Sequence, residues 1–417
     1  MPPDSTPPFE LPVELPGRRR FLKQAASVAT LLSPFALAAC GGSGGTTSNS
    51  GSAPPVTGPT GFEGEVLIIG AGAAGMSAGH LLFQQGIRFQ ILEAQARPGG
   101  RMRHDTTFTD FPVSLGAEWL HVPRDELNNI VNDDTVSVDI ETRGYSTNDS
   151  YGRFSGGELS LDTLGRYDDL KFIASSWMDF FERFVLPNVS NQITYETPIT
   201  SINYSGERLY AEDASGNRWE ADKIIVTVPL AVLQNRDVSF TPALPATRTS
   251  LIEDALIWGG FKAFFEFSDA FYPTFLDFDD SDTSDGQRTY YDAAYGQSTS
   301  TNLLGLFAVG RQAEPYQALA GDAQHDYILA ELDEVFDGAA TASYQRHLVQ
   351  DWNAEPYARG AYLADVSSLN ITRELARSID GRLYFAGDAY TQEDDWGAVH
   401  NAARSARDAV TEILASA

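Results

Sequence analysis

The chain has 417 residues, a formal net charge of −28 and 42% hydrophobic residues, a composition typical of a packed globular protein of one large or two interlocked domains. The acidic balance argues against nucleic-acid binding, which needs basic surfaces. It weakly favours cationic ligands through long-range attraction, and solubility in a salty habitat explains it equally well.

The first 60 residues show the pattern of an export signal followed by a tether. A basic block beginning at Arg18 and Arg19 precedes an apolar run, residues 25–39, that is too short to span a bilayer. The arginine pair resembles a twin-arginine signal, and the run ends in Cys40 within a segment that resembles a bacterial lipobox. We expect residues 1–39 to be a twin-arginine lipoprotein signal peptide and residues 40–61 a flexible Gly/Ser/Thr/Pro tether. The chain would then be exported and lipid-anchored through Cys40 on the periplasmic or cell-surface side, whereas the alternative is a tail with a chance cysteine.

The folded sequence opens with a candidate dinucleotide-binding turn. Residues 66–69 form an apolar run typical of a buried parallel strand, and G-x-G-x-x-G follows directly. A helical pattern over residues 76–85 and a second strand over residues 88–92 complete a strand–helix–strand unit that ends in Glu93. The glycines let the backbone approach a pyrophosphate at the helix N-terminus, and Glu93 can accept hydrogen bonds from a ribose. A glycine-rich turn without a ligand is the alternative.

The residues after Glu93 favour FAD over NAD. Arg97, Gly99, Gly100 and Arg101 form an A-R-x-G-G-R run, which resembles the second phosphate-side motif of the FAD-dependent amine oxidases. Two guanidinium groups near a pyrophosphate are chemically reasonable, because arginine binds phosphate oxygens bidentately.

Further segments resemble the same family in the same order along the chain. Residues 115–123 contain a G-A-x-W-x-H segment of the polyamine oxidase type, and residues 198–233 a β-meander. Residues 259–273 form an aromatic strand, and residues 351–362 run from a tryptophan to a tyrosine. Residues 382–410 show a C-terminal strand, an acidic turn and a long helix. The resemblance implies an α/β fold with a discontinuous FAD-binding Rossmann-like domain of the glutathione-reductase type and an inserted α+β substrate domain. It places the FAD-binding domain at residues 62–125, 192–235 and 346–417, and the substrate-binding domain at residues 126–191 and 236–345.

The resemblance also assigns the FAD contacts. Asp388 ends a strand and would bind the ribityl chain or phosphates, although a turn or cap aspartate is the alternative. The helix beginning near Gly397 would direct its positive end at the negative edge of the reduced flavin. The full set of expected cofactor-binding residues is Gly70, Gly72, Gly75, Glu93, Arg97, Gly100, Arg101, Ile199, Gly387, Asp388, Ala398 and Val399.

Three residues carry the expected catalytic roles. Lys262 lies in an otherwise aromatic strand and, by resemblance, faces flavin N5 through a water, although strand alternation is also consistent with a surface lysine. Tyr362 matches a ring that stands before the flavin face and steers the amine. His121 is a candidate substrate contact or proton acceptor, with a structural histidine as the alternative.

One position departs from the family pattern. The usual ring partner of Tyr362 would fall at Ala398, which weakens a monoamine oxidase interpretation, and Trp396 is expected to take over part of that role. Trp119 and Trp396 are therefore the expected substrate-binding residues. No metal-ligand spacing is found among the histidines.

These features predict an FAD-dependent enzyme that oxidises a polyamine or other primary or secondary amine. The expected acceptor is oxygen, which yields hydrogen peroxide. The alternatives are a membrane-anchored dehydrogenase that passes electrons to a quinone or cytochrome, a variant that desaturates a cyclic substrate, and a non-catalytic FAD-binding scaffold.

Two local expectations concern the insertions. Residues 170–185 have the spacing of one amphipathic helix. Residues 277–286 are rich in aspartate but do not match the EF-hand spacing, and we expect a solvated acidic loop.

Overall fold

The computed structural model describes residues 61–364 and 367–416. The twin-arginine segment and Cys40 lie outside these residues. Within them, no helix combines the length and the apolar character that a bilayer-crossing segment needs.

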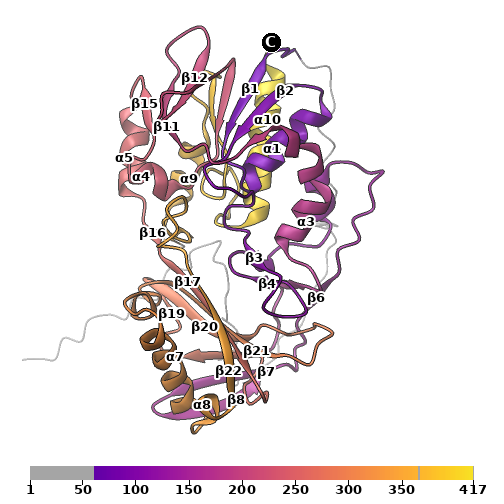
Figure 1. Cartoon of the computed structure of the whole chain (residues 1–417), viewed down its shortest axis with the longest axis vertical. Helices are drawn as coiled ribbons and strands as arrows, with labels where there is room; N and C mark the ends of the chain where they lie inside the picture. Colours follow the sequence, from indigo (N-terminus) through magenta and orange to yellow (C-terminus); the bar gives the residue numbers. More distant parts are fainter. Residues whose placement is uncertain (1–60, 365–366, 417) are drawn as a thin grey trace, which may run out of the picture.

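A parallel five-stranded sheet organises one half of the molecule (Figure 1). Its strand order is β10-β2-β1-β14-β24, with bounds Ile193–Thr194, Arg88–Leu92, Glu65–Ile69, Lys223–Val226 and Leu383–Phe385. Each adjacent pair is parallel. Strand β24 comes from the far end of the chain, so the sheet joins segments that lie more than three hundred residues apart in sequence.

The two faces of this sheet are covered by different layers. Side chains alternate along β1: Val66 and Ile68 face a core shared with α1 (Ala73–Gln84) and α10 (Val399–Ala415), whereas Leu67 and Ile69 face the opposite core. On that side lie an antiparallel meander with one added strand and three short helices. Their bounds are β11 Ile199–Asn203, β12 Leu209–Asp213, β13 Arg218–Ala221, β15 Ser239–Thr241, α4 Leu230–Gln234, α5 Ala246–Asp254 and α9 Leu369–Ala376.

A second, largely antiparallel sheet forms the other half of the molecule (Figure 1). Its main path is β22-β17-β21-β20-β18-β7-β8, with bounds Tyr344–Asp351, Gly260–Phe267, Asn302–Gly310, Gly286–Asp292, Phe275–Phe278, Ser150–Ser155 and Glu158–Thr163, and β19 (Asp282–Thr283) pairs with β20. Helices α6 (Glu314–Gln317), α7 (Asp322–Val335) and α8 (Ala339–Ser343) accompany it. The odd-numbered residues Phe261 to Phe267 of β17 pack in the core beneath α7.

Small elements connect the halves. They are β3 His104–Asp105, β4 Val113–Ser114, β5 Trp119–Leu120, α2 Glu126–Val131, β6 Thr142–Gly144, β9 Leu170–Phe172, α3 Trp177–Phe184, the 3-10 turns Leu186–Asn188 and Ser190–Gln192, β16 Ile257–Trp258 and β23 Tyr362–Leu363. The strand–helix–strand unit and the meander are confirmed. The boundaries proposed between an FAD-binding and a substrate-binding domain stay predictions.

The prediction of one helix over residues 170–185 is wrong in its first half. Residues 170–172 form β9, which lies between β5 and β6, and only Trp177–Phe184 is helical. Ser176 begins the helix, because its side chain accepts a hydrogen bond from the Asp179 amide. The consequence is that Lys171 lies on a strand, directly opposite Trp119.

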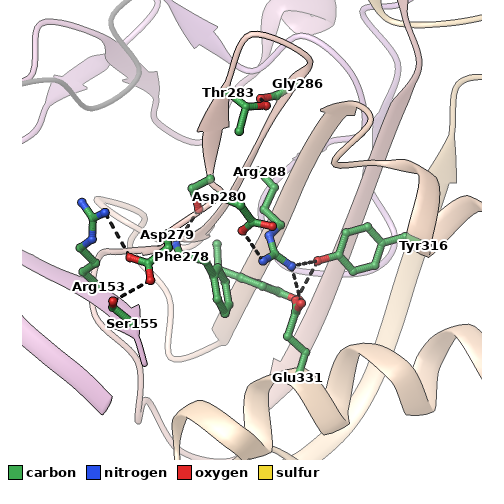
Figure 2. A network of polar contacts seen from close by, with 12 residues as sticks. Arg153, Ser155, Phe278, Asp279, Asp280, Thr283, Gly286, Arg288, Tyr316 and Glu331 are labelled. Carbon is green, nitrogen blue, oxygen red and sulfur yellow. Dashed lines mark hydrogen bonds and ion pairs between the residues drawn. The ribbon is translucent and has the colours of Figure 1, made fainter. Parts of the chain in front are cut away.

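The aspartate-rich segment is solvated at its tip but not throughout. Asp279 and Asp280 are exposed and pair with Arg153 and Arg288 (Figure 2). Asp277, in contrast, is 6% exposed and accepts a hydrogen bond from Tyr151. Burial raises the pKa of Asp277 to about 7, so the expectation of a solvated loop is wrong for this residue.

Arg288 also belongs to a buried polar network that ties β20 to α7 (Figure 2). Its guanidinium pairs with Glu331, whose carboxylate accepts hydrogen bonds from Tyr290 at 2.6 Å and Tyr316 at 2.7 Å. The arginine and glutamate side chains are 12% and 14% exposed. Removing Glu331 would leave the buried Arg288 guanidinium with only the exposed Asp280 as an ion-pair partner, and would leave Tyr290 and Tyr316 without their acceptor.

We therefore expect Glu331→Ala to lower the free energy of unfolding by about 3–5 kcal/mol. The matched control is Asp168→Ala, which breaks the exposed Arg166–Asp168 pair and should cost at most about 1 kcal/mol. Urea unfolding followed by circular dichroism measures both values. Equal losses in the two variants would contradict the structural role of the buried network.

Candidate active site

One cavity of about 540 Å³ lies where the two halves of the molecule meet. Its floor is formed at the carboxyl ends of β1, β2 and β14, where Ile69, Leu92 and Thr227 line it. Its opposite wall comes from the second sheet, with Lys262 of β17 and Phe307 of β21. The carboxyl edge of a parallel sheet is the usual ligand-binding place in α/β proteins.

The glycine turn leaves room at this edge. A Cβ atom on Gly75 would lie 1.9 Å from the Gly70 carbonyl oxygen, so only glycine fits there. A Cβ atom on Gly72 would meet no described atom within 4 Å, because it would project into the open cavity. Gly72 precedes α1 in extended conformation, so the amides of the first helical turn face this space.

Glu93 lies at the end of β2 and lines the cavity. Its carboxylate accepts hydrogen bonds from the Ala71 amide at 2.6 Å and the Gln95 amide at 2.8 Å. Burial raises the pKa of Glu93, and these backbone donors oppose that effect. A carboxylate in this place can accept hydrogen bonds from ligand hydroxyl groups.

The two arginines of the A-R-x-G-G-R run have different partners. Arg97 donates from Nη1 to the carbonyl oxygens of Pro98 and Gly100, both at 3.2 Å, while its buried Nη2 has no hydrogen-bond partner within the described residues. Burial lowers the pKa of Arg97. Arg101 instead pairs bidentately with Asp388, at 2.5 and 3.1 Å. The unsatisfied Nη2 of Arg97 fits an anionic group that the protein does not itself supply.

The C-terminal segment closes the cavity on the side of Asp388. Gly387, Asp388, Ala398 and Val399 line it, together with Ile199 at the start of β11. Helix α10 begins here with Ala398 as its N-cap residue. The Ala398 amide, however, donates to the Asn401 side chain at 3.3 Å. Of the two amides expected to face the cofactor, those of Ala398 and Val399, only that of Val399 then remains as a donor.

Lys262 is buried in the cavity wall. It is 3% exposed, and it shares its face of β17 with Phe264, as strand alternation predicts. The interpretation of Lys262 as a surface lysine is therefore wrong. Its ammonium group donates to the carbonyl oxygens of Ser114 at 2.8 Å and Gly116 at 3.2 Å, and to Glu118 at 2.5 Å.

His121, Tyr362 and Trp119 line the same cavity. His121 Nδ1 lies 2.9 Å from a carboxylate oxygen of Asp169. The Trp119 ring is buried, and the Lys262 ammonium lies 5.4 Å from its centre. Three of the expected catalytic and substrate-binding side chains thus come together with Lys262.

Trp396 lies elsewhere. It is not among the described residues that line the cavity, and its indole donates to the Leu363 carbonyl oxygen at 3.0 Å within the hydrophobic core. The indole thus contacts the residue that follows Tyr362, and the expected role of Trp396 beside that ring stays a prediction. Trp352 and Phe307 are among the further aromatic residues that line the cavity.

Comparison with known proteins identifies the family. Residues 188–414 match the model of the flavin containing amine oxidoreductases, and residues 68–133 match the NAD(P)-binding Rossmann-like domain. The chain belongs to the flavin containing amine oxidoreductases. The expected α/β fold with a Rossmann-like domain and the FAD cofactor are confirmed.

Individual relatives of this flavin containing amine oxidoreductase are distant but cover most of it. A probable polyamine oxidase 4 of Arabidopsis thaliana is 22% identical over 81% of this chain and 84% of its own length. The lysine-specific histone demethylase 1B of Mus musculus is 23% identical over 78% of this chain and 50% of its own length.

Solved structures share the fold. A wild-type putrescine oxidase bound to putrescine has a TM-score of 0.69 at 15% identity, covering 85% of this chain and 99% of its own. Cyclohexylamine oxidase from Brevibacterium oxydans has a TM-score of 0.68 at 16% identity, with the same coverage.

The residues of the cavity fit FAD. The open space beside Gly72 suits a pyrophosphate and Glu93 suits a ribose. Arg97 is not among the described residues that line the cavity, and its charge lies behind the lining residues Gly99 and Gly100. Asp388, held by Arg101, offers carboxylate oxygens to the hydroxyl groups of the ribityl chain. The first turn of α10 would lie beside the negative edge of the reduced flavin.

Sequence reasoning missed three residues that surround Lys262. Glu118 immediately precedes β5, Lys171 lies on β9 and Tyr291 lies on β20, and all three are buried. An available signal was the scarcity of lysine, because only four occur in the chain and two of them are Lys171 and Lys262. The wrong helix prediction over residues 170–185 hid the position of Lys171.

One group of potential metal ligands occurs among the described residues, although the sequence spacing indicated none. Atoms of His104, Asp179 and Glu182 lie within 4.8 Å of one another. His104 Nδ1 already contacts the Ser176 hydroxyl at 2.7 Å and Asp179 at 3.3 Å, and its hydrogen bond with Asp179 raises the pKa of His104. These contacts account for His104 without a metal.

We expect Gly72→Val to leave the fold intact and to lower FAD binding at least tenfold, because the new side chain enters the open space of the cavity rather than protein. Gly144→Ala is the control. Gly144 lies on the largely exposed strand β6, and its new Cβ atom would make only an ordinary contact with the Leu170 side chain. The ratio of flavin to protein absorbance and the apoprotein melting temperature are measured. Full FAD content in Gly72→Val would contradict the placement of the pyrophosphate.

Proposed function

We propose that this enzyme oxidises an amine at the carbon next to nitrogen and uses oxygen as the acceptor, yielding an imine and hydrogen peroxide. The observation that carries the proposal is the single cavity in which the FAD-binding residues Gly72 and Asp388 meet Lys262, His121 and Tyr362. The family match supports the amine as the substrate class. The imine then hydrolyses to a carbonyl compound and an amine or ammonia.

The cofactor supplies the redox chemistry: bound FAD accepts a hydride equivalent from the substrate carbon and passes the electrons to oxygen. The protein orients the substrate and excludes water from this place. Tyr362, with the aromatic side chains of Trp119 and Phe307, forms an apolar wall that favours the neutral form of the amine nitrogen.

His121 is the proposed acceptor for the proton of the incoming amine. Asp169 lies 2.9 Å from its Nδ1 and favours a proton on that nitrogen. This tautomer leaves Nε2 as the nitrogen that would accept the proton. Asp169 would therefore act as the residue that orients His121.

Polyamines are the favoured substrate class within this proposal. The support comes from the relatives, which include polyamine oxidases of Arabidopsis thaliana and Oryza sativa and a putrescine oxidase. The acidic net charge of −28 attracts such cations over a distance. The dehydrogenase and scaffold alternatives receive no support from these comparisons, and an open cavity that reaches Lys262 is not needed in a scaffold.

Anaerobic titration of the holoenzyme tests the substrate class. We expect spermidine, spermine or putrescine to bleach the flavin absorbance near 450 nm stoichiometrically, and readmitted oxygen to restore it with release of hydrogen peroxide. Oxidised flavin that no amine of the panel bleaches would overturn the proposal. If the bleached flavin is reoxidised slowly in air and rapidly by a quinone, the acceptor is the quinone rather than oxygen.

We further propose that the enzyme is exported by the twin-arginine route and anchored by lipid at Cys40. The support is the order of the two signals, Arg18-Arg19 and then the lipobox-like segment, upstream of a Gly/Ser-rich tether. Lipidated cysteine with several acyl chains would give stable attachment.

Cys40→Ser should release a soluble protein that retains its FAD, because the anchor is separate from the cavity. Replacement of both Arg18 and Arg19 by lysine should instead retain the holoprotein in the cytoplasm. Fractionation of cells that express each variant, with flavin absorbance of each fraction, measures both outcomes. Loss of FAD from the Cys40→Ser protein, or its continued membrane attachment, would contradict the separation.

A further inference from the structure

Four buried side chains form a polar cluster at the active-site cavity; two of them, Glu118 and Lys262, line it, and the other two lie behind them. Glu118 is at its centre: one carboxylate oxygen lies 2.5 Å from the Lys262 ammonium, and the other lies 2.9 Å from the Lys171 ammonium. The Tyr291 hydroxyl donates to Glu118 at 2.5 Å. Glu118 is 7% exposed, and the other three side chains are 3% exposed or less. We call these four residues the Glu118 cluster.

Lys262 is immobilised by this arrangement. An ammonium group has three hydrogens to donate, and Lys262 directs them to Ser114, Gly116 and Glu118. It cannot turn toward a ligand without breaking one of these bonds inside the protein. Lys262 therefore acts in the structure as a charge fixed in the cavity wall.

The cluster contains one more cation than anion. Burial opposes ionisation of Glu118, but the two ammonium groups and Tyr291 outweigh it and lower the pKa of Glu118 to about 2. Burial raises the pKa of Tyr291 well above its usual value, so its hydroxyl stays neutral. Burial also lowers the pKa of Lys262, and the charge and hydrogen bond of Glu118 oppose that effect. With both ammonium groups protonated, two lysines and one glutamate leave a net charge of one positive unit.

The nearest further acid does not complete an ion pair. Asp292 interacts electrostatically with Lys171, but burial raises the pKa of its carboxyl, and no ion pair joins the two within the described residues. The Lys171 ammonium also donates a hydrogen bond to the Ala293 carbonyl oxygen at 2.7 Å. The excess positive charge accordingly belongs to the cluster itself.

A buried excess charge is unfavourable in a purely structural role. A Lys–Glu pair, or apolar side chains of the same volume, would fill this place at a lower desolvation cost. The excess becomes favourable when a negative charge develops nearby. Reduction of a flavin in the adjoining cavity creates such a charge, because the reduced ring is anionic.

We propose that Glu118 and Lys171 are positioning residues that hold Lys262 in the cavity wall. They give the Glu118 cluster a net positive charge, which stabilises the reduced form of the bound flavin. The proposal rests on FAD occupying this cavity. Lys171 supplies the excess charge, Glu118 joins the two lysines, and Tyr291 fixes Glu118. Neither Glu118 nor Lys171 needs to touch the amine.

The test compares charge rather than packing. Lys171→Met lowers the cluster charge from one to zero. Glu118→Gln combined with Lys171→Met returns it to one through Lys262 alone, and the variants are compared at about pH 6, because loss of Glu118 removes the group that opposes the lowering of the Lys262 pKa by burial. At fixed potential, we expect the single variant to shift the ratio of reduced to oxidised flavin at least tenfold toward the oxidised form, about 30 mV for a two-electron couple. The double variant should return to within threefold of the parent enzyme.

The midpoint potential of each holoenzyme is measured by anaerobic equilibration with a redox dye and a chemical reductant. Lys223→Met is the matched control, because Lys223 is a half-buried lysine beside the Phe62 and Tyr384 rings at the amino end of β14, remote from the cavity residues. It should leave the potential unchanged. Because no amine takes part, failure of the proposed substrate class would leave this measurement intact.

Melting temperature and FAD content separate a structural role from the proposed one. A role in packing alone would lower the melting temperature of Lys171→Met without moving its potential, and the double variant would be less stable still. Either an unchanged potential in Lys171→Met or no recovery in the double variant overturns the proposal. If Lys171→Met does not give folded holoprotein, Lys171→Gln makes the same charge change and keeps a donor for the Ala293 carbonyl oxygen.

Discussion

A bidentate ion pair between Arg101 and Asp388 holds the two ends of the folded chain together, 287 positions apart. The pair closes the carboxyl edge of a parallel sheet in which the first strand, β1, and the last strand, β24, flank β14. Because the cavity takes residues from both ends, neither end alone can form it. FAD binding is therefore a property of the completed fold, and export through a route that carries folded proteins would suit such a chain.

The sequence predicted the parts of this site that depend on local sterics. The glycine turn could be recognised because a Cβ atom on Gly75 would clash with the Gly70 carbonyl oxygen, so the position requires glycine. Glu93 could be recognised because it ends the next strand. Strand alternation placed Lys262 and Phe264 on one face of β17, although it did not decide whether that face is buried. Each of these features is determined within a few residues of its own position.

The parts that depend on packing between distant segments could not be predicted in the same way. Residues 170–185 have helical spacing, but pairing of β9 with β5 and β6 places Lys171 beside Glu118 instead. Asn401 takes the Ala398 amide, although family resemblance assigned this position to the cofactor, and the Trp396 indole donates to the Leu363 carbonyl oxygen. A resemblance identifies which position should act, whereas the surrounding contacts decide whether its donors remain available.

The net charges of the whole protein and of the Glu118 cluster have opposite signs, and this difference bears on how an amine reacts. The protein as a whole is strongly acidic, which attracts a protonated amine from solution. Near Lys262 the Glu118 cluster is positive, and the aromatic wall provides little solvation, so both effects disfavour the protonated nitrogen there. An amine that moves inward must lose its proton before its carbon can be oxidised, and His121 with Asp169 lies in the cavity to accept that proton. The same positive wall that would stabilise a reduced flavin would thus also favour the neutral amine that reduces it.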